Sequence, residues 1–108
     1  LLLDDCRLPG DALLSNAGGL GAPLSCLDEA RYGIVWGAIG AARSCYEAAR
    51  EYAMTREQFG QPIGGFQLTQ AKLADMAVEV NRGLLLALHL GRLKDENRLR
   101  PEQVSLGK

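Results

Sequence analysis

The stretch Tyr52-Ala53-Met54-Thr55-Arg56-Glu57-Gln58-Phe59-Gly60-Gln61-Pro62-Ile63 decides the fold, because one long helical pattern ends within it and another begins shortly after it. Pro62 lacks the amide hydrogen that a helix needs, and two glycines, Gly64 and Gly65, stand close behind it. The chain is therefore predicted to leave one helix here, turn, and return in a second helix antiparallel to the first.

Residues 25–55, which include the start of this stretch, favour a helix. Ser25 is a suitable first residue, since its side-chain oxygen can accept an unpaired amide hydrogen and the carboxylate of Asp28 suits the positive end of a helix. The apolar residues repeat at spacings of three and four, as on one wide face of a helix. The residues of this predicted face are Ala30, Ile34, Ala38, Ala41, Cys45, Ala48 and Tyr52.

Gly33, Gly37 and Ala41 stand four residues apart on one side of the same helix. Glycine lowers helix propensity, so its use here suggests that the backbone of another helix approaches closely. We prefer ordinary tight core packing over a ligand-binding role for these residues.

A second long helix is predicted over about residues 66–97, and Pro101 begins a third, since proline fits a first helical turn. Residues 1–23 form a connector, with a turn at Leu8–Asp11 and a small-residue linker at Asn16–Pro23. The predicted buried stripe of the second helix comprises Leu73, Met76, Ala77, Val80, Leu84, Ala87, Leu88 and Gly91.

The predicted fold is all-α: a partial up-down helical bundle of two long antiparallel helices plus the start of a third, with a short extended N-terminal connector. Two helices near thirty residues each would be about 45 Å long, which exceeds the natural span of a compact domain of 108 residues. We therefore expect partner helices from another subunit or from a missing part of the polypeptide. The lack of an initiator methionine and an end inside a new helix predict that the chain is a fragment of a larger protein.

Composition excludes several classes of partner. With 47% hydrophobic and 23% charged residues, the chain can build one modest core. Its net charge of -1 lacks the basic surface with which proteins neutralise nucleic-acid phosphates, so no nucleic acid is expected. The longest apolar run, Ile34–Ala42, is too short to cross the roughly 30 Å of bilayer hydrocarbon, so no membrane span is expected.

The residues with reactive side chains form no catalytic or metal-binding pattern. Cys6, Cys26 and Cys45 are widely spaced and His89 is the only histidine, so neither a disulfide framework nor a metal site is predicted. A reducing compartment fits this cysteine usage best. The carboxylates suit solvated helix faces, caps and ion pairs, and none is predicted to be a general base.

Arg56 and Phe59 form a predicted anion-binding corner where the first helix ends. A guanidinium can bind phosphate through two parallel hydrogen bonds, and a neighbouring aromatic ring can cover a flat heterocycle, so a dinucleotide is a natural ligand. Residue type alone favours commoner roles for three side chains. Arg56 would be a surface arginine, Phe59 a core residue and Gln67 a helix cap.

The order Arg-x-Gln-Phe-Gly-x-Pro-Ile, followed by Phe66 and Gln67, resembles the flavin-contacting segment of the acyl-CoA dehydrogenases. The resemblance covers nearly the whole chain and leans toward the glutaryl-CoA dehydrogenase branch through Leu90–Asp95. It implies that residues 1–23 connect from the end of a missing β-domain and that residues 24–108 are part of the C-terminal helical domain. The other segments that carry it are Cys26–Gly37, Tyr52–Ile63 and Gln67–Met76.

The resemblance also implies roles for five residues. Arg56 would contact the pyrophosphate of FAD, Phe59 would pack near the dinucleotide, and Gln67 would donate a hydrogen bond to it, across the interface of a homo-oligomer. Asp28 and Arg31 would lie beside the bound acyl-CoA. Arg31 is the stronger of these two predictions, because a cation is less expected than an anion at the positive end of a helix.

In enzymes of this kind, a glutamate removes the α-proton of the acyl thioester and the flavin N5 accepts hydride from the β-carbon. Glutaryl-CoA would also lose carbon dioxide, giving crotonyl-CoA, and an electron-transfer flavoprotein or a similar acceptor would reoxidise the flavin. The catalytic glutamate is expected downstream of Lys108, so no catalytic residue is assigned within the chain and the chain alone should be inactive.

Two further expectations concern setting and role. The resemblance implies the cytoplasm for a bacterial protein and the mitochondrial matrix for a eukaryotic one. The competing hypothesis is a non-catalytic helical oligomerisation module, in which the cofactor-binding residues are present but unused.

Overall fold

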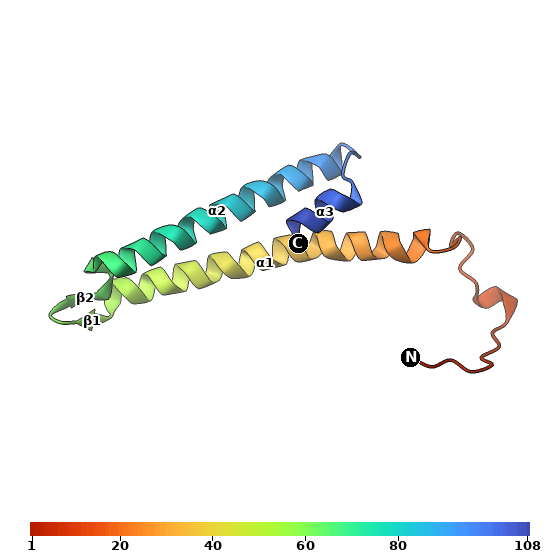
Figure 1. Ribbon diagram of the computed structural model, residues 1–108, viewed down its shortest axis with the longest axis horizontal. Helices are drawn as coiled ribbons and strands as arrows, with labels where there is room; N and C mark the ends of the chain where they lie inside the picture. The colour runs from red at the N-terminus through yellow and green to blue at the C-terminus, as the bar shows by residue number, and fades with distance from the viewer.

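Two long antiparallel helices form the body of the molecule, as the computed structural model of residues 1–108 shows (Figure 1). Helix α1 spans Gly21–Thr55 and helix α2 spans Gln67–Asp95. A short third helix, α3 (Pro101–Gly107), turns back and lies against both. The molecule measures 73 × 36 × 16 Å, so it is a slab about as thick as one layer of helices. The predicted all-α fold and antiparallel arrangement are confirmed.

A small hairpin, which we did not predict, joins the two long helices. Strand β1 (Glu57–Gln58) pairs antiparallel with β2 (Gln61–Pro62), and a single 3₁₀ turn, η2 (Ile63–Gly65), leads into α2. The two residues at the tip have positive φ angles, as the tight two-residue hairpin turns require. The hairpin projects beyond the ends of both helices (Figure 1).

Helix α1 begins earlier than we predicted. It starts at Gly21, and Ser25 is not its cap but lies within the helix, where its Oγ donates a hydrogen bond to the carbonyl of Ala22 at 2.8 Å. Pro23 was assigned to the linker, yet it sits in the first turn, where proline leaves no helical hydrogen bond unmade. The prediction overrated the small residues before Ser25 as helix breakers.

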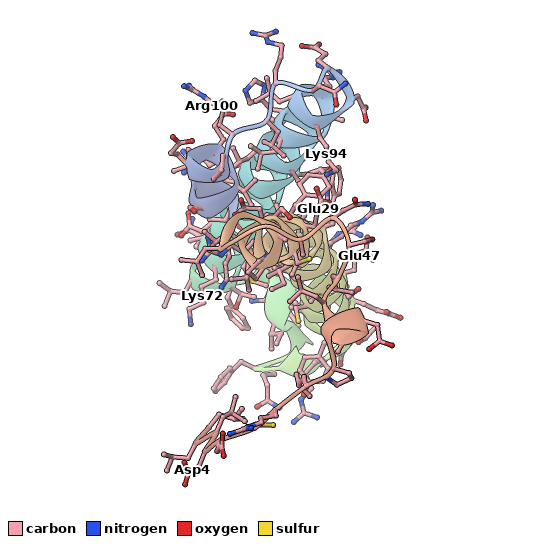
Figure 2. All side chains as sticks on the ribbon, turned by 90° about the vertical axis from the view of Figure 1, so that its right-hand side faces the viewer. Asp4, Glu29, Glu47, Lys72, Lys94 and Arg100 are labelled. Carbon is pink, nitrogen blue, oxygen red and sulfur yellow. The ribbon has the colours of Figure 1, made fainter.

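The segment before α1 lies apart from the helices (Figures 1 and 2). Its only regular element is a 3₁₀ turn, η1 (Gly10–Ala12), which overlaps the predicted turn at Leu8–Asp11. Nearly all of its side chains are exposed. This segment therefore adds little to the packing of the helices.

The core lies where the three helices meet. Val35 of α1 packs with Ala87 and Leu90 of α2, and each is at most 2% exposed. Val104 of α3 is also buried.

None of the helices carries an apolar segment of the length that crossing a bilayer requires.

The face of α1 that packs against α2 is not the face that we predicted. Of the predicted residues, Ile34 remains 49% exposed and Tyr52 60% exposed. The spacing of three and four was correct, but α1 is apolar over a wide sector, and periodicity does not say which part of the sector meets α2. The residues that are buried or half-buried along α1 include Tyr32, Val35, Ile39, Ala42, Tyr46, Ala49 and Ala53.

The stripe predicted for α2 is largely correct. Leu84 and Leu88 are the exceptions, since they remain 40% and 42% exposed. Leu90 and Leu93 are buried although we did not predict it. A Cβ on Gly107 would collide with Leu90, so α3 packs closely against this side chain, and a helix of seven residues leaves too weak a periodic signal to reveal that contact.

The close helix approach predicted at Gly33 and Gly37 does not occur within this chain. A Cβ at either position would meet nothing within 4 Å. The close approaches come instead from α2, where a Cβ on Gly83 would collide with Ile39 and one on Gly91 would lie 3.3 Å from Trp36. The side of α1 that carries Gly33 and Gly37 is open.

Replacing Leu90 with alanine should destabilise the chain by about 2–5 kcal/mol, because it removes a side chain at the contact of all three helices. Leu85→Ala is the matched control, since Leu85 lies on the same helix but is 66% exposed, and it should cost less than about 1 kcal/mol. Urea unfolding followed by helical circular dichroism measures both. Equal losses in the two variants would contradict the packing described here.

Candidate functional site

The hairpin places Arg56 at the end of α1 with its backbone held on both sides. The amide of Arg56 donates to the carbonyl of Tyr52 at 2.8 Å, and the amide of Ile63 donates to the carbonyl of Arg56 at 2.8 Å. The side chain is exposed and takes part in none of the ion pairs or side-chain hydrogen bonds of the molecule. The backbone of Arg56 is therefore held in place, while the donors of its guanidinium are all free.

Phe59 stands at the tip of the hairpin in an unfavourable setting. Its φ angle is 55°, which is uncommon for a residue with a bulky side chain, and its side chain is 93% exposed. Its only aromatic neighbour is Phe66, whose ring lies edge-on at 6.3 Å between centroids. Strain combined with exposure of a large apolar ring is characteristic of binding sites rather than of packing. The commoner role of a core phenylalanine is excluded within this chain.

Gln67 is the first residue of α2 and does not cap it. The cap position belongs to Phe66, and no side chain forms a capping hydrogen bond there. The side-chain amide of Gln67 is exposed and makes no hydrogen bond within the chain. The start of α2, and with it Gln67, lies at the same end of the molecule as the hairpin (Figure 1). Arg56, Phe59 and Gln67 therefore all lie in or beside the connection between α1 and α2.

Asp28 and Arg31 lie on the N-terminal half of α1, away from the hairpin. Their closest charged atoms, Arg31 Nη1 and Asp28 Oδ1, are 3.7 Å apart. The side chain of Arg31 is 41% exposed and that of Asp28 is 28% exposed. Because α1 begins at Gly21, both residues lie beyond its first turn, where the helix dipole has little effect. The dipole argument for Arg31 was therefore wrong, although the residue remains partly free to bind an anion.

A groove of about 320 Å³ adjoins Asp28 where the three helices come together. It includes Asp28 but not Arg31, and an ion pair closes one side of it: Lys94 Nζ lies 2.7 Å from Glu29 Oε2 and 5.0 Å from the centre of the Tyr32 ring. Figure 2, which looks along the long axis, shows Lys94 above Glu29. Sequence reasoning missed this pair because its members are 65 residues apart.

The two groups of candidate residues occupy different parts of the molecule. Arg31 and Arg56 are separated by 25 positions along α1, which corresponds to about 37 Å at 1.5 Å per residue. No three carboxylate, thiol or imidazole side chains gather where they could hold a metal ion, and all three cysteines are unpaired and exposed. The two groups of candidate residues thus lie on two separate surfaces of the chain.

Comparison with known proteins identifies the family. Residues 17–108 match the acyl-CoA dehydrogenase C-terminal domain family. The chain is 40% identical over 100 residues to a glutaryl-CoA dehydrogenase of Desulfococcus multivorans, covering 92% of this chain and 26% of that protein. It is 37% identical over 99 residues to the human mitochondrial short-chain specific acyl-CoA dehydrogenase, covering 91% of this chain and 24% of that protein.

Two solved structures of glutaryl-CoA dehydrogenase from Mycobacterium smegmatis have the same fold. One is 67% identical with a TM-score of 0.90, over 94% of this chain and 26% of that one. The other, a complex with FADH2, is 57% identical with a TM-score of 0.92, over 98% of this chain and 28% of that one. The chain spans about a quarter of the length of these relatives, and it belongs to the acyl-CoA dehydrogenase family through the C-terminal helical domain.

Proposed function

We propose that this chain contributes the cofactor-binding hairpin and part of the acyl-CoA surface of a flavin-dependent acyl-CoA dehydrogenase of the glutaryl type. The observation that carries the proposal is the exposed, unpaired Arg56 at the foot of a hairpin whose tip presents the strained, exposed ring of Phe59. The similarity to glutaryl-CoA dehydrogenases at 57% and 67% identity supports the choice of substrate.

The residues at the hairpin fit FAD. The planar guanidinium of Arg56 can donate two parallel hydrogen bonds to the pyrophosphate, and the amide of Gln67 can donate another to the cofactor. The ring of Phe59 can exclude water from a flat ring system, a contact that would compensate for its exposure. FAD would supply the hydride acceptor, while the residues of this chain bind and orient it. The solved relative that contains FADH2 supports this assignment.

The acyl-CoA surface is assigned to Asp28 and Arg31. Coenzyme A is polyanionic, and Arg31 offers a permanent positive charge with only a long contact to Asp28. Asp28 can keep the guanidinium oriented while no ligand is bound. The proton-abstracting glutamate is assigned to a part of the enzyme outside these 108 residues.

The separation of the two surfaces supports an assembly of two or more copies of the chain. Hydride transfer requires the flavin and the acyl chain to touch, yet Arg31 and Arg56 are about 37 Å apart along α1. A second copy that brings its hairpin to the acyl-CoA surface of the first would resolve this distance. We therefore assign Arg56, Phe59 and Gln67 to the FAD site of a neighbouring subunit.

Arg56→Ala should weaken FAD binding on the order of 10- to 100-fold, because it removes charge-assisted hydrogen bonds to pyrophosphate. Arg50→Ala is the matched control, since Arg50 is an exposed, unpaired arginine on the same helix with the same charge. Flavin fluorescence titration of the flavin-free protein measures both affinities. Arg56→Lys should fall between the two, because lysine keeps the charge but loses the planar fork.

FAD affinity in Arg56→Ala equal to that of the wild type would refute the proposed role of the hairpin. Equal weakening in Arg56→Ala and Arg50→Ala would also refute it, since the effect would then reflect net charge alone.

Arg31→Ala should weaken acyl-CoA binding roughly tenfold while FAD affinity stays unchanged, because the residue lies far from the hairpin. The perturbation of the visible flavin spectrum by glutaryl-CoA, titrated into the flavin-loaded protein, measures the acyl-CoA affinity. Arg50→Ala again serves as the control. Loss of FAD affinity in Arg31→Ala without loss of acyl-CoA affinity is the result that contradicts this assignment.

The open apolar faces favour a second candidate function, that of a helical oligomerisation module without cofactor. Only 6 of 108 residues are buried in the single chain, so assembly is needed under either proposal. The two differ in flavin content. A yellow protein that retains FAD supports the enzymatic role, whereas a colourless dimer that does not take up FAD supports the module.

A further inference from the structure

One side-chain hydrogen bond ties α2 to the connection that carries the hairpin. Gln70 Nε2 donates to the carbonyl oxygen of Gly64 at 3.0 Å. Gln70 belongs to the first turns of α2, and Gly64 is the middle residue of η2. No other side-chain hydrogen bond joins α2 to the segment between the long helices.

Gly64 is itself pressed against α1. A Cβ at this position would lie 3.0 Å from the carbonyl oxygen of Ala53 and 3.4 Å from its carbon, so the two backbones are in direct contact. Ala53 is only 3% exposed. Through Gly64, the amide of Gln70 therefore joins the start of α2 to the last turns of α1.

The hairpin has little other support. All four of its strand residues are exposed. Its return to the body of the molecule depends on the amide of Ile63, which donates to Arg56 and directly precedes Gly64. The direction in which the hairpin points therefore depends on the place at which η2 is held, together with the bond from the amide of Arg56 to α1.

We infer that Gln70 is a positioning residue for the FAD contacts, acting through Gly64 on the hairpin and through its own helical turn on Gln67. This inference rests on the proposed function of the hairpin. The same bond would add only local stability if the hairpin bound nothing, so the test must separate position from stability.

The test compares two variants that each lose one amide-to-carbonyl hydrogen bond. Gln70→Met keeps the length of the side chain but removes the donor. Asn81→Leu removes the bond from Asn81 Nδ2 to the carbonyl of Ala77, which lies wholly within α2 and away from the hairpin. FAD affinity should fall roughly fivefold in Gln70→Met and stay within about twofold in Asn81→Leu, as expected for one hydrogen bond.

Three further readouts distinguish positioning from stability. Gln70→Lys restores a donor of similar reach and should recover FAD affinity to within about twofold of the wild type. In the double variant with Arg56→Ala, Gln70→Met should lower FAD affinity by less than it does alone, because both substitutions act on the same contact. Without FAD, hydrogen exchange of the Ile63 amide should be faster in Gln70→Met than in Asn81→Leu.

Wild-type FAD affinity in Gln70→Met, alongside weakened binding in Arg56→Ala, would overturn the positioning role and leave the proposed function intact. Unchanged affinity in Arg56→Ala would overturn both. A third outcome would assign Gln70 to stability alone. In that outcome, Gln70→Met weakens FAD binding, its effect multiplies fully with that of Arg56→Ala in the double variant, and Gln70→Lys does not restore the affinity.

Discussion

The contact between the backbones of Gly64 and Ala53 is the constraint on which the arrangement of this chain depends. Two helices as long as α1 and α2 can lie antiparallel only if the chain reverses close to both ends. Where η2 meets α1, a Cβ on Gly64 would lie only 3.0 Å from the carbonyl oxygen of Ala53, so a side chain there would crowd the two backbones. Glycine meets this requirement because it has no Cβ. The reversal leaves the residues between α1 and η2 to project as a hairpin, and the candidate site is built on that projection.

The thin slab leaves much apolar surface uncovered. The accessible area of the whole chain, including the exposed segment before α1, is 8817 Å², whereas a compact protein of 11.6 kDa exposes about 5,800 Å². The excess of about 3,000 Å² is comparable to the area buried in obligate protein interfaces. Small residues such as Gly33 and Gly37 line the open side of α1 and would allow another helix to approach closely.

The sequence predicted the elements better than their packing. Proline and glycine marked the reversal, and Pro101 marked the start of α3, because these residues act locally. Which side of α1 meets α2 was beyond prediction, since the apolar sector of α1 covers more than one face. For the site, chain order placed Arg56, Phe59 and Gln67 together, but only the coordinates revealed the positive φ of Phe59 and the bond from Gln70. The Lys94–Glu29 pair joins residues too far apart in sequence for local spacing to reveal.

In the proposed assembly, the guanidinium of Arg56 binds the diphosphate of a flavin held by a neighbouring subunit. The most direct measurement is the distance from the Arg56 nitrogens to the pyrophosphate oxygens in an experimental structure of the flavin-loaded assembly. We expect about 2.7–3.2 Å, with Arg56 and the flavin-binding β-domain on different subunits. A guanidinium pointing into solvent, with the pyrophosphate held by other groups, would contradict it.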